Sequence, residues 1–475
     1  MSKNNVGEKA LKAGIGYTIG NILVKGISFL SIPIFARLLT VTDYGIYNTF
    51  SSYVSILSVI IGFALHVSIK NANIDYKKKI NEYCSSISLL ILFNTVFLII
   101  ISFIGRREIS SFLALEHDYF TILIVIESFG MMMITFYNSV LAIEYRYKEY
   151  LGVSLVFSVM GILLSVIFVV FLFPEQKYLG RILGTLISAV IIGLYIFYAL
   201  YRLNKPTINI EYWKYGLKIS LPIIPHGLSQ IVLAQFDRLM IKKLTGSYDA
   251  GIYSFAYNIG TIFQVVVNSL DTAWAQWFFD QMYEKKYNKI KKVANLYAGL
   301  VAFFAWGLML ISPELITIMG GAKYNDSKYV ALPIVLAMFY SYMYYFPSSV
   351  EYYYKKTKII AVGTMIAASL NIILNAIFIP QYGYIAAAYT TVACYLVYYI
   401  MHMFFAYKIH GKNIFDNFIH ISIVIGLTVA MFFCQLIIDN VLLRYFVLGI
   451  SIALFLIVVL KNKTKVLSML SSNKE

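Results

Sequence analysis

Long apolar runs follow one another along the chain, separated by short polar connections. A helix needs roughly 20 apolar residues to cross about 30 Å of hydrocarbon. Runs such as SLLILFNTVFLIIISFI are continuously apolar, whereas the strands of a membrane β-barrel would alternate. The pattern predicts an all-α polytopic membrane protein with about 14 transmembrane helices. The predicted spans are 14–38, 46–66, 83–104, 119–142, 151–173, 178–201, 216–240, 251–273, 293–312, 329–350, 358–379, 383–407, 415–437 and 441–460.

Composition supports a lipid-facing exterior. Of the 475 residues, 60% are hydrophobic and 13% are charged, whereas a soluble protein carries about 25% charged residues. The net charge of +16 would suggest nucleic acid as a partner in a soluble chain. Here the preference of basic residues for cytoplasmic loops and anionic headgroups explains it, so we expect no nucleic-acid partner.

The distribution of lysine and arginine predicts the orientation. With the N-terminus inside, the cytoplasmic segments hold 26 of the 39 basic residues and the outer segments hold 10. The basic runs at 75–79, 284–292 and 354–358 all fall on the inner side. Positively charged loops stay cytoplasmic, so both termini are expected there.

A corner between spans occurs twice. The stretch LTVTDYGIYN at 39–48 returns as LTGSYDAGIYS at 244–254, which aligns the first span with the seventh. Six spans separate the copies, so the two halves have the same topology and are related by an axis along the membrane normal. The duplication predicts a six-helix lobe at 1–203, a second at 204–410, and two appended helices with a tail at 411–475.

The repeated residues suggest a local structure. Gly45 and Gly251 suit a tight turn in which φ is positive, and the Asp two places earlier can cap the next helix. This motif is either purely structural or a contact to substrate at the rim of a cavity. Secondary transporters place substrate between two such halves, so we expect the first and seventh spans to face each other across a central cavity.

Two blocks carry a family resemblance: IPIFARLLTVTDYGIYN, and LPIIPHGLSQIVLAQFDRLMIKKLTGSYDAGIYSFAYNIG at 221–260. They resemble the Wzx polysaccharide flippases of the multidrug, oligosaccharidyl-lipid and polysaccharide exporter superfamily. The resemblance implies two six-helix lobes in a bacterial cytoplasmic (inner) membrane. It also implies outward transport of undecaprenyl-diphosphate-linked sugar repeat units for O-antigen (lipopolysaccharide) or capsule synthesis. A polysaccharide polymerase and a chain-length regulator are the further partners it implies.

Cations within or beside spans are candidates for binding the diphosphate of such a cargo. Charge inside hydrocarbon is costly and therefore suggests function. Lys25 lies about 12 Å into the first span at 1.5 Å per residue, and either faces a hydrated cavity or snorkels to the surface. Arg37 and Lys242 are equivalent in the repeat and could form a cationic rim. Arg238 either binds substrate, pairs with Asp237 beside it, or meets lipid headgroups.

Ionisable and helix-breaking residues in the spans are candidates for ion coupling and motion. Glu127 and Asp271 could bind a proton or sodium ion, or could simply be polar groups near span ends. His226 titrates near neutrality but is more often a packing residue when it stands alone. Pro222 and Pro225 interrupt the helix hydrogen bonding and predict a hinge.

Motifs for enzymatic chemistry are missing from the sequence. It contains no G-x-x-x-x-G-K-[ST] nucleotide loop, and its three cysteines have no metal-ligand spacing. We therefore expect no cofactor, no metal and no enzymatic activity, with transport coupled to protons or sodium. The expected function is a flippase for a lipid-linked oligosaccharide. The alternatives are a drug or cation exporter of the same superfamily, which would favour acidic cavity residues, and a membrane enzyme such as a polymerase.

Overall fold

The structure is a computed structural model that describes residues 3–461, and all regular elements within that range are helical. Within this described range, thirteen helices are long and apolar enough to cross a membrane. The chain is therefore an all-α polytopic membrane protein. The long helices of the first half are α1 (Lys3–Leu38), α2 (Val41–Gly62), α4 (Ile80–Ile104), α6 (Phe120–Ile143), α7 (Tyr147–Ile167), α8 (Lys177–Leu203) and α10 (Ile224–Thr245).

Shorter helices connect these in the first half. They are η1 (Leu65–Val67), α3 (Ser68–Asp75), η2 (Lys77–Lys79), α5 (Arg106–Leu113), η3 (Phe168–Leu172), α9 (Ile210–Ser220) and η4 (Leu221–Ile223). The second half contains α11 (Ser247–Tyr283), α12 (Tyr287–Gly320), η5 (Ala322–Tyr324), α13 (Ser327–Met343), α14 (Tyr345–Tyr353), α15 (Thr357–His410), α16 (Asn417–Leu436) and α17 (Val441–Lys461).

The difference between 13 candidate spans and 14 predicted ones lies in α15. This helix is 54 residues long, about twice what a bilayer needs. Its backbone leaves helical geometry at Gly383, where φ is 66° and ψ is −159°. Glycine tolerates this conformation because it has no Cβ. The two predicted spans, 358–379 and 383–407, are therefore separate helices that meet at Gly383 and fold back on each other, as the bond between Thr364 and Tyr398 at 2.9 Å shows.

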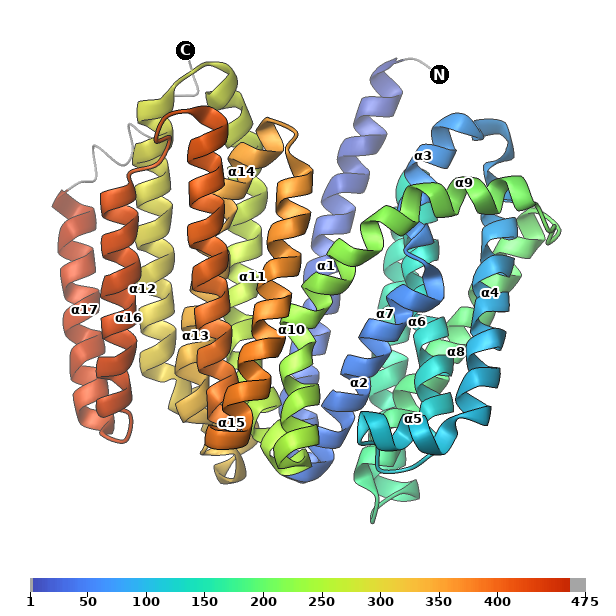
Figure 1. Ribbon diagram of the computed structural model, residues 1–475, viewed down its shortest axis with the longest axis horizontal. Helices are drawn as coiled ribbons and strands as arrows, with labels where there is room; N and C mark the ends of the chain where they lie inside the picture. The colour runs from blue at the N-terminus through green and yellow to red at the C-terminus, as the bar shows by residue number, and fades with distance from the viewer. Residues whose placement is uncertain (1–2, 462–475) are drawn as a thin grey trace. The chain divides into compact units, whose positions relative to one another are not determined.

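Packing divides the chain into two compact units, residues 1–251 and 252–475. In the first unit, α6 is the central helix and packs against α2, α4, α7 and α8, while α1 packs on α7 and α10 packs along α2. Figure 1 shows α9 running crosswise to α4 before the chain turns into α10. The compact first unit thus includes α9 and α10, beyond residue 203. The predicted boundary at 203 concerns the duplication and stays a prediction.

In the second unit, the most buried span is the one formed by α13 and α14. Of the residues in its 18-residue apolar stretch, 83% are buried. α13 packs against α12, α15 and α16. The two last helices run alongside α12 (Figure 1). In the apolar stretch of α17 only 6% of the residues are buried, so nearly all side chains of this helix are exposed on the surface of the protein. The main anchor of α17 is Arg444, which binds Glu314 of α12 at 2.7 Å.

The two copies of the repeated corner touch each other. A Cβ placed on Gly45 would lie 1.9 Å from the backbone oxygen of Ser247, and a Cβ on Gly251 would lie 2.1 Å from the oxygen of Val41. Val41 and Ser247 hold equivalent places, four residues before each glycine. The contact is therefore reciprocal, as a two-fold relation between the copies requires, and both corners lie on the same side of the membrane.

The expectation of a positive φ at these glycines was wrong. Gly45 and Gly251 lie inside the first turns of α2 and α11, and neither is among the glycines with positive φ. Glycine is needed because two backbones cross at van der Waals distance, where no side chain fits. The positive φ falls instead at Gly246, where φ is 109° as α10 ends.

The capping role expected of the Asp was correct for the first copy. Thr40 and Asp43 form a capping box at the start of α2: the Asp43 amide donates to Thr40 Oγ1 at 3.1 Å, and the Thr40 amide donates to Asp43 Oδ2 at 3.0 Å. Each bond satisfies an amide that the helix itself cannot. The corner therefore begins α2 at a fixed residue.

Candidate functional site

A polar cavity of about 430 Å³ opens within the first unit, between α1, α2, α6, α7, α8 and α10. Both the first and the seventh predicted spans contribute to it, through Ser28 and Ser31 on α1 and Ile231 on α10. The expectation that these two spans face each other across a central cavity between the halves stays a prediction, since this cavity lies within the first unit. The lining residues are Ser28, Ser31, Tyr47, Ser51, Val54, Ser55, Ser58, Glu127, Met131, Thr135, Phe157, Ser158, Gly161, Ile162, Arg181, Thr185 and Ile231.

Hydroxyl groups dominate the polar part of the wall. Most of them donate to a carbonyl of their own helix: Ser28 to Val24 at 2.9 Å and Ser55 to Ser51 at 2.9 Å are examples. A hydroxyl group that donates its hydrogen to a backbone carbonyl can still accept a hydrogen bond through its oxygen. The wall therefore offers acceptors at many points, which suits a ligand with many O–H donors, such as a sugar.

One cation enters this cavity, and the candidates chosen from sequence did not include it. Arg181 of α8 is only 8% exposed, and its guanidinium carbon lies 3.5 Å from the ring centroid of Phe35 and 4.6 Å from that of Tyr47. These rings come from α1 and α2 and hold the charge by cation–π contact. The Nε and Nη1 atoms have no hydrogen-bond partner among the described residues, so a planar donor group is held ready for a ligand.

Glu127 of α6 lines the same cavity and is 6% exposed. Thr185 and Arg181 are the groups that act on its carboxyl, while Oε2 has no hydrogen-bond partner within residues 3–461. One acid and one base thus share a hydroxyl-lined space. Of the candidates chosen from sequence, Glu127 is the one that the structure places in this wall.

The candidate cations of the first span lie elsewhere. Lys25 is exposed on α1, one helical turn before the cavity residue Ser28, and is not among the residues that line the cavity. Arg37 is exposed at the end of α1. A role for either in binding substrate stays a prediction.

The candidate cations of the seventh span are buried in α10. Lys242 is 8% exposed and bonds to Glu116 at 2.6 Å, and the other Glu116 oxygen accepts from Ser247 at 3.1 Å. Arg238 is 9% exposed and donates to Gln235, which in turn accepts from Ser52 of α2 at 3.1 Å. These contacts attach α10 to its neighbours, and neither cation lines the cavity. Their predicted contact with substrate stays a prediction.

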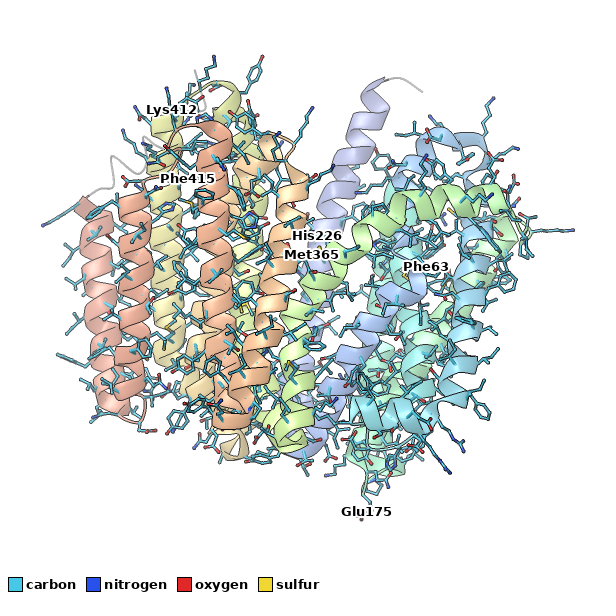
Figure 2. All side chains as sticks on the ribbon, in the orientation of Figure 1. Phe63, Glu175, His226, Met365, Lys412 and Phe415 are labelled. Carbon is cyan, nitrogen blue, oxygen red and sulfur yellow. The ribbon has the colours of Figure 1, made fainter. Side chains whose placement is uncertain are left out.

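The predicted hinge region coincides with an interruption of the helix. α9 ends at Ser220, a 3₁₀ turn occupies Leu221–Ile223, and α10 begins at Ile224. Pro222 lies within this turn, Pro225 lies in the first turn of α10, and both are exposed. His226 lies in the first turn of α10, just after the break (Figure 2), and its Nδ1 is buried with no partner in the described part of the chain. Movement at this break, and coupling through His226, remain predictions.

The remaining acidic candidate, Asp271, lies in the second unit. It is half-buried on α11 and interacts electrostatically with the tyrosines at 342, 345 and 352. The structure therefore does not bring Asp271 into the cavity of the first unit. Coupling through Asp271 also stays a prediction.

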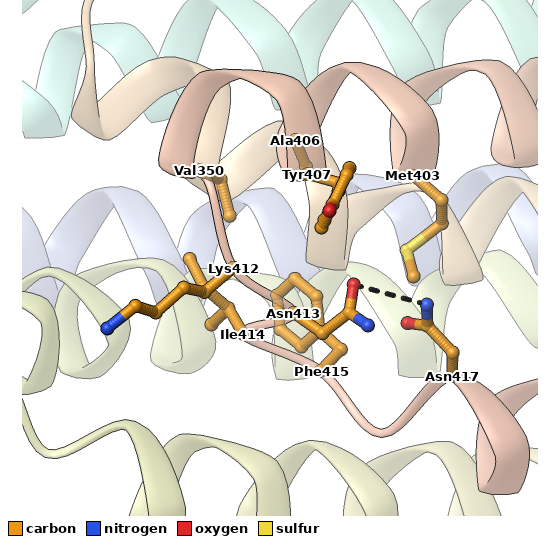
Figure 3. Close-up of a pocket in the computed structure, with 9 residues that line it drawn as sticks. All are labelled: Val350, Met403, Ala406, Tyr407, Lys412, Asn413, Ile414, Phe415 and Asn417. Carbon is orange, nitrogen blue, oxygen red and sulfur yellow. Dashed lines mark hydrogen bonds between the residues drawn. The ribbon is translucent and has the colours of Figure 1, made fainter.

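A second enclosed space, between α14, α15 and α16, is too small for a substrate. It measures about 10 Å³ and is lined by residues such as Val350, Met403 and Phe415. In Figure 3 the Asn417 amide donates to Asn413 beside it, at 3.3 Å. A cavity needs about 10–15 Å³ to hold a single water molecule. The cavity with Arg181 is the candidate site because its wall combines charged side chains with hydroxyl groups, whereas the pockets of about 530 Å³ on α7 and about 460 Å³ on α15 have apolar walls.

The fold and the site define a polytopic membrane protein with a hydroxyl-lined cavity that holds one cation and one acid. The chain belongs to the polysaccharide biosynthesis protein family, whose model matches residues 10–282, more than half of the chain. It is 21% identical over 370 residues to Lsg locus putative protein 1 of Haemophilus influenzae, covering 74% of this chain and 87% of that protein. It is also 21% identical over 403 residues to a probable low-salt glycan biosynthesis flippase, Agl15, of Haloferax volcanii, covering 82% of each.

Solved structures share the fold. The lipid II flippase MurJ in an inward closed conformation superposes with a TM-score of 0.72 at 16% identity, covering 95% of this chain and 100% of that one. A multidrug resistance MATE family transporter in an inward-facing conformation gives a TM-score of 0.59 at 15% identity, covering 81% of this chain and 99% of that one. The chain therefore has the fold of this superfamily, as the resemblance of its corner motifs implied.

Proposed function

We propose that this protein is a flippase that moves lipid-linked oligosaccharide repeat units from the cytoplasmic to the outer leaflet of a bacterial cytoplasmic membrane. The observation that carries the proposal is Arg181, a buried guanidinium whose Nε and Nη1 find no partner within residues 3–461, in a wall of hydroxyl acceptors. Arginine forks bind diphosphate oxygens with strong, charge-assisted hydrogen bonds. The hydroxyls around it suit the sugar that follows the diphosphate in such a cargo.

The membrane arrangement of the proposal follows from the sequence. The basic loops favour cytoplasmic N- and C-termini, and undecaprenyl diphosphate is the carrier implied by the family resemblance. Transport would proceed by alternating access between the two halves, with the break at Pro222 and Pro225 as a hinge. The products would serve O-antigen or capsule synthesis, with a polymerase and a chain-length regulator as downstream partners.

Lys25 keeps a place in this proposal as a first contact for the anionic headgroup. It is exposed on α1 one turn from Ser28, so an incoming diphosphate could pass from Lys25 to Arg181 along one helix face. If so, Lys25→Ala should lower glycan export at normal membrane abundance, and Lys25→Arg should keep part of it. Full export by Lys25→Ala would remove Lys25 from the pathway.

The experiment that tests the proposal is deletion of the gene, followed by assay of the leaflet in which lipid-linked glycan remains. The proposal predicts accumulation in the cytoplasmic leaflet and loss of surface glycan, both restored by the wild-type gene. Unchanged surface glycan together with an unchanged leaflet distribution would contradict it.

Glu127 favours a second candidate, an ion-coupled exporter of drugs or other organic cations. A buried carboxyl with an unpartnered oxygen in the cavity would attract a cationic ligand. The two candidates separate by substitution: cation export would be lost in Glu127→Gln and tolerate Arg181→Gln. Export of an anionic headgroup would fail in Arg181→Gln.

A further inference from the structure

A buried acid–base pair lies in the second unit, in residues that the cavity does not use. His402 of α15 and Glu351 of α14 meet with the imidazole Nδ1 at 2.7 Å from Oε1 and 2.8 Å from Oε2 of the carboxyl. Both side chains are 0% exposed. A charged carboxylate is costly to bury unless a partner compensates its charge. We therefore expect the pair to hold one proton, shared between the carboxyl group and the imidazole, in addition to the proton of a neutral imidazole.

The imidazole is fixed by its neighbours. The rings of Tyr344 and Tyr398 stand edge-on to it, at centroid distances of 4.8 and 4.6 Å. Its far nitrogen, Nε2, lies against Gly363, where a Cβ would be 2.4 Å away. This Nε2 is buried and has no hydrogen-bond partner in the described chain. The only polar contact of the imidazole in that range is therefore the Glu351 carboxyl.

The groups near the pair include one further acidic side chain, Asp271 of α11. Glu351 interacts electrostatically with Tyr344, Tyr352 and Tyr398, from the N-terminal flank of α14, α14 itself and α15. α11 packs on α14 through the bond from Trp274 Nε1 to Ser349 Oγ, and its half-buried Asp271 acts on Tyr352. α13 packs on both α14 and α15, and its one charged residue, Lys328, is paired with Asp439. The first half of α15 contributes Gly363 and the hydroxyl of Thr364, which bonds to Tyr398 at 2.9 Å.

The position of the pair gives it a short route to water. Glu351 lies two residues before the end of α14 at Tyr353, and the exposed cations Lys355 and Lys356 follow directly. This end of the helix is the predicted cytoplasmic end. A proton thus needs to travel only about two residues of helix, on the order of 3 Å, once α14 and α15 part locally.

We infer that Glu351 and His402 form a proton-binding latch between α14 and α15. With one proton, the pair is net neutral, and the hydrogen bond that Nδ1 shares between the two carboxyl oxygens joins the helices. A second proton, taken from water, binds a Glu351 oxygen and leaves a neutral carboxylic acid beside an imidazolium. The charge attraction between the two side chains is lost and their hydrogen bond weakens, no other product forms, and release of the same proton restores the contact. This proposal rests on the proposed transport function, in which the latch supplies coupling to protons.

The first test measures proton binding on the full-length protein in lipid nanodiscs, without any glycan. Infrared difference spectra between neutral and acidic pH should show a carboxylic acid band in the wild type. The component of the band that belongs to Glu351 should be missing in Glu351→Gln and should shift in His402→Gln, because the imidazole is its hydrogen-bond partner. Glu314→Gln is the matched control, since Glu314 pairs with Arg444 on the membrane-exposed α17, and should leave the band unchanged.

The spectra of the two variants show whether Glu351 and His402 bind the proton together. Superimposable spectra for the wild type and Glu351→Gln would overturn the proposal. If Glu351→Gln fails to accumulate in the membrane, His402→Gln decides alone: an unshifted band refutes the pair as the proton site, and a shifted or lost band supports it.

The second test measures coupling in cells. Surface glycan export by the wild type should fall when a protonophore collapses the proton gradient, whereas the residual export of Glu351→Gln should not respond. A wild type that exports equally well with and without the protonophore would overturn the coupling role. If the wild type exports no glycan at all, the proposed function fails, and the infrared measurement still decides the proton site.

Discussion

We expect a side chain added at the crossing of the two repeated corners to destabilise the protein, because the two backbones are in direct contact there. In Gly45→Ala the new methyl group would lie 1.9 Å from the Ser247 oxygen, whereas ordinary contact begins at 3.4 Å. The atom in the way belongs to the backbone, so no side chain can rotate to make room. The helices must separate by about 1.5 Å, the difference between those two distances.

The energetic cost follows from overpacking. Adding a methylene-sized group to a tightly packed site costs about 1–3 kcal/mol. Alanine also favours a helix over glycine by about 0.5–1 kcal/mol, which offsets part of that cost. Gly152→Ala is the matched control, because Gly152 lies within α7 and an added Cβ would meet nothing within 4 Å. The gain in helix propensity from glycine to alanine is common to both variants. The difference between their unfolding temperatures therefore reports the steric clash at the crossing.

The assay is thermal unfolding of the purified proteins in one detergent. Gly45→Ala should unfold at a lower temperature than Gly152→Ala, and the reciprocal Gly251→Ala should behave like Gly45→Ala. Equal unfolding temperatures for Gly45→Ala and Gly152→Ala would refute the close crossing and the two-fold relation inferred from it.

Three further changes test other contacts. Thr40→Ala removes the hydroxyl half of the α2 capping box and should lower stability by about 0.5–2 kcal/mol, measured by thermal unfolding against the wild type. Lys242→Met leaves the Glu116 carboxylate without its buried partner and should cost about 1–3 kcal/mol; a Lys242→Met/Glu116→Gln double variant should recover part of it, and no recovery would contradict the pairing. Burial lowers the pKa of His66, so the unfolded chain binds its proton more readily and stability should fall as pH drops below about 6.5. His66→Gln should flatten this dependence in unfolding curves taken from roughly pH 7.5 to 5.5, and an unchanged slope would exclude His66 as its source.

The sequence predicted the fold well because lipid imposes a simple rule on it. Every span must be long and apolar, and the runs that meet this rule match the observed helices, including the two that join at Gly383. The repeated corner likewise predicted that both copies lie on one side of the membrane. The reason for its glycines was missed, because a crossing of two backbones involves residues about 206 positions apart, which no local pattern reveals.

The site was predicted only in part. Glu127 could be found because an acid in mid-span is rare. Arg181 was overlooked because it lies four residues into α8, where a cation usually reaches the membrane surface. What keeps it inside is stacking on Phe35 and Tyr47 from two other helices. Its one visible signal was an arginine between Gly180 and Gly184 at the start of an apolar run.

The sequence did not show that Lys242 has an acidic partner. From the sequence it was a candidate cation at a cavity rim, yet Glu116, 126 residues earlier, neutralises it. The buried pair of Glu351 and His402 was missed for the same reason, since the two residues are 51 positions apart and meet only when α14 packs on α15. Spacing along one chain does not reveal pairs that form between helices.

The most direct test of the proposed function is leaflet-resolved measurement of lipid-linked glycan in cells that carry Arg181→Gln. Arg202→Gln is the control, because Arg202 is exposed at the opposite end of the same helix. With both variants at wild-type abundance in the membrane, Arg181→Gln should retain lipid-linked glycan in the cytoplasmic leaflet and lose surface glycan, and Arg202→Gln should match the wild type. Wild-type surface glycan in Arg181→Gln cells would contradict a diphosphate-binding role for this cavity.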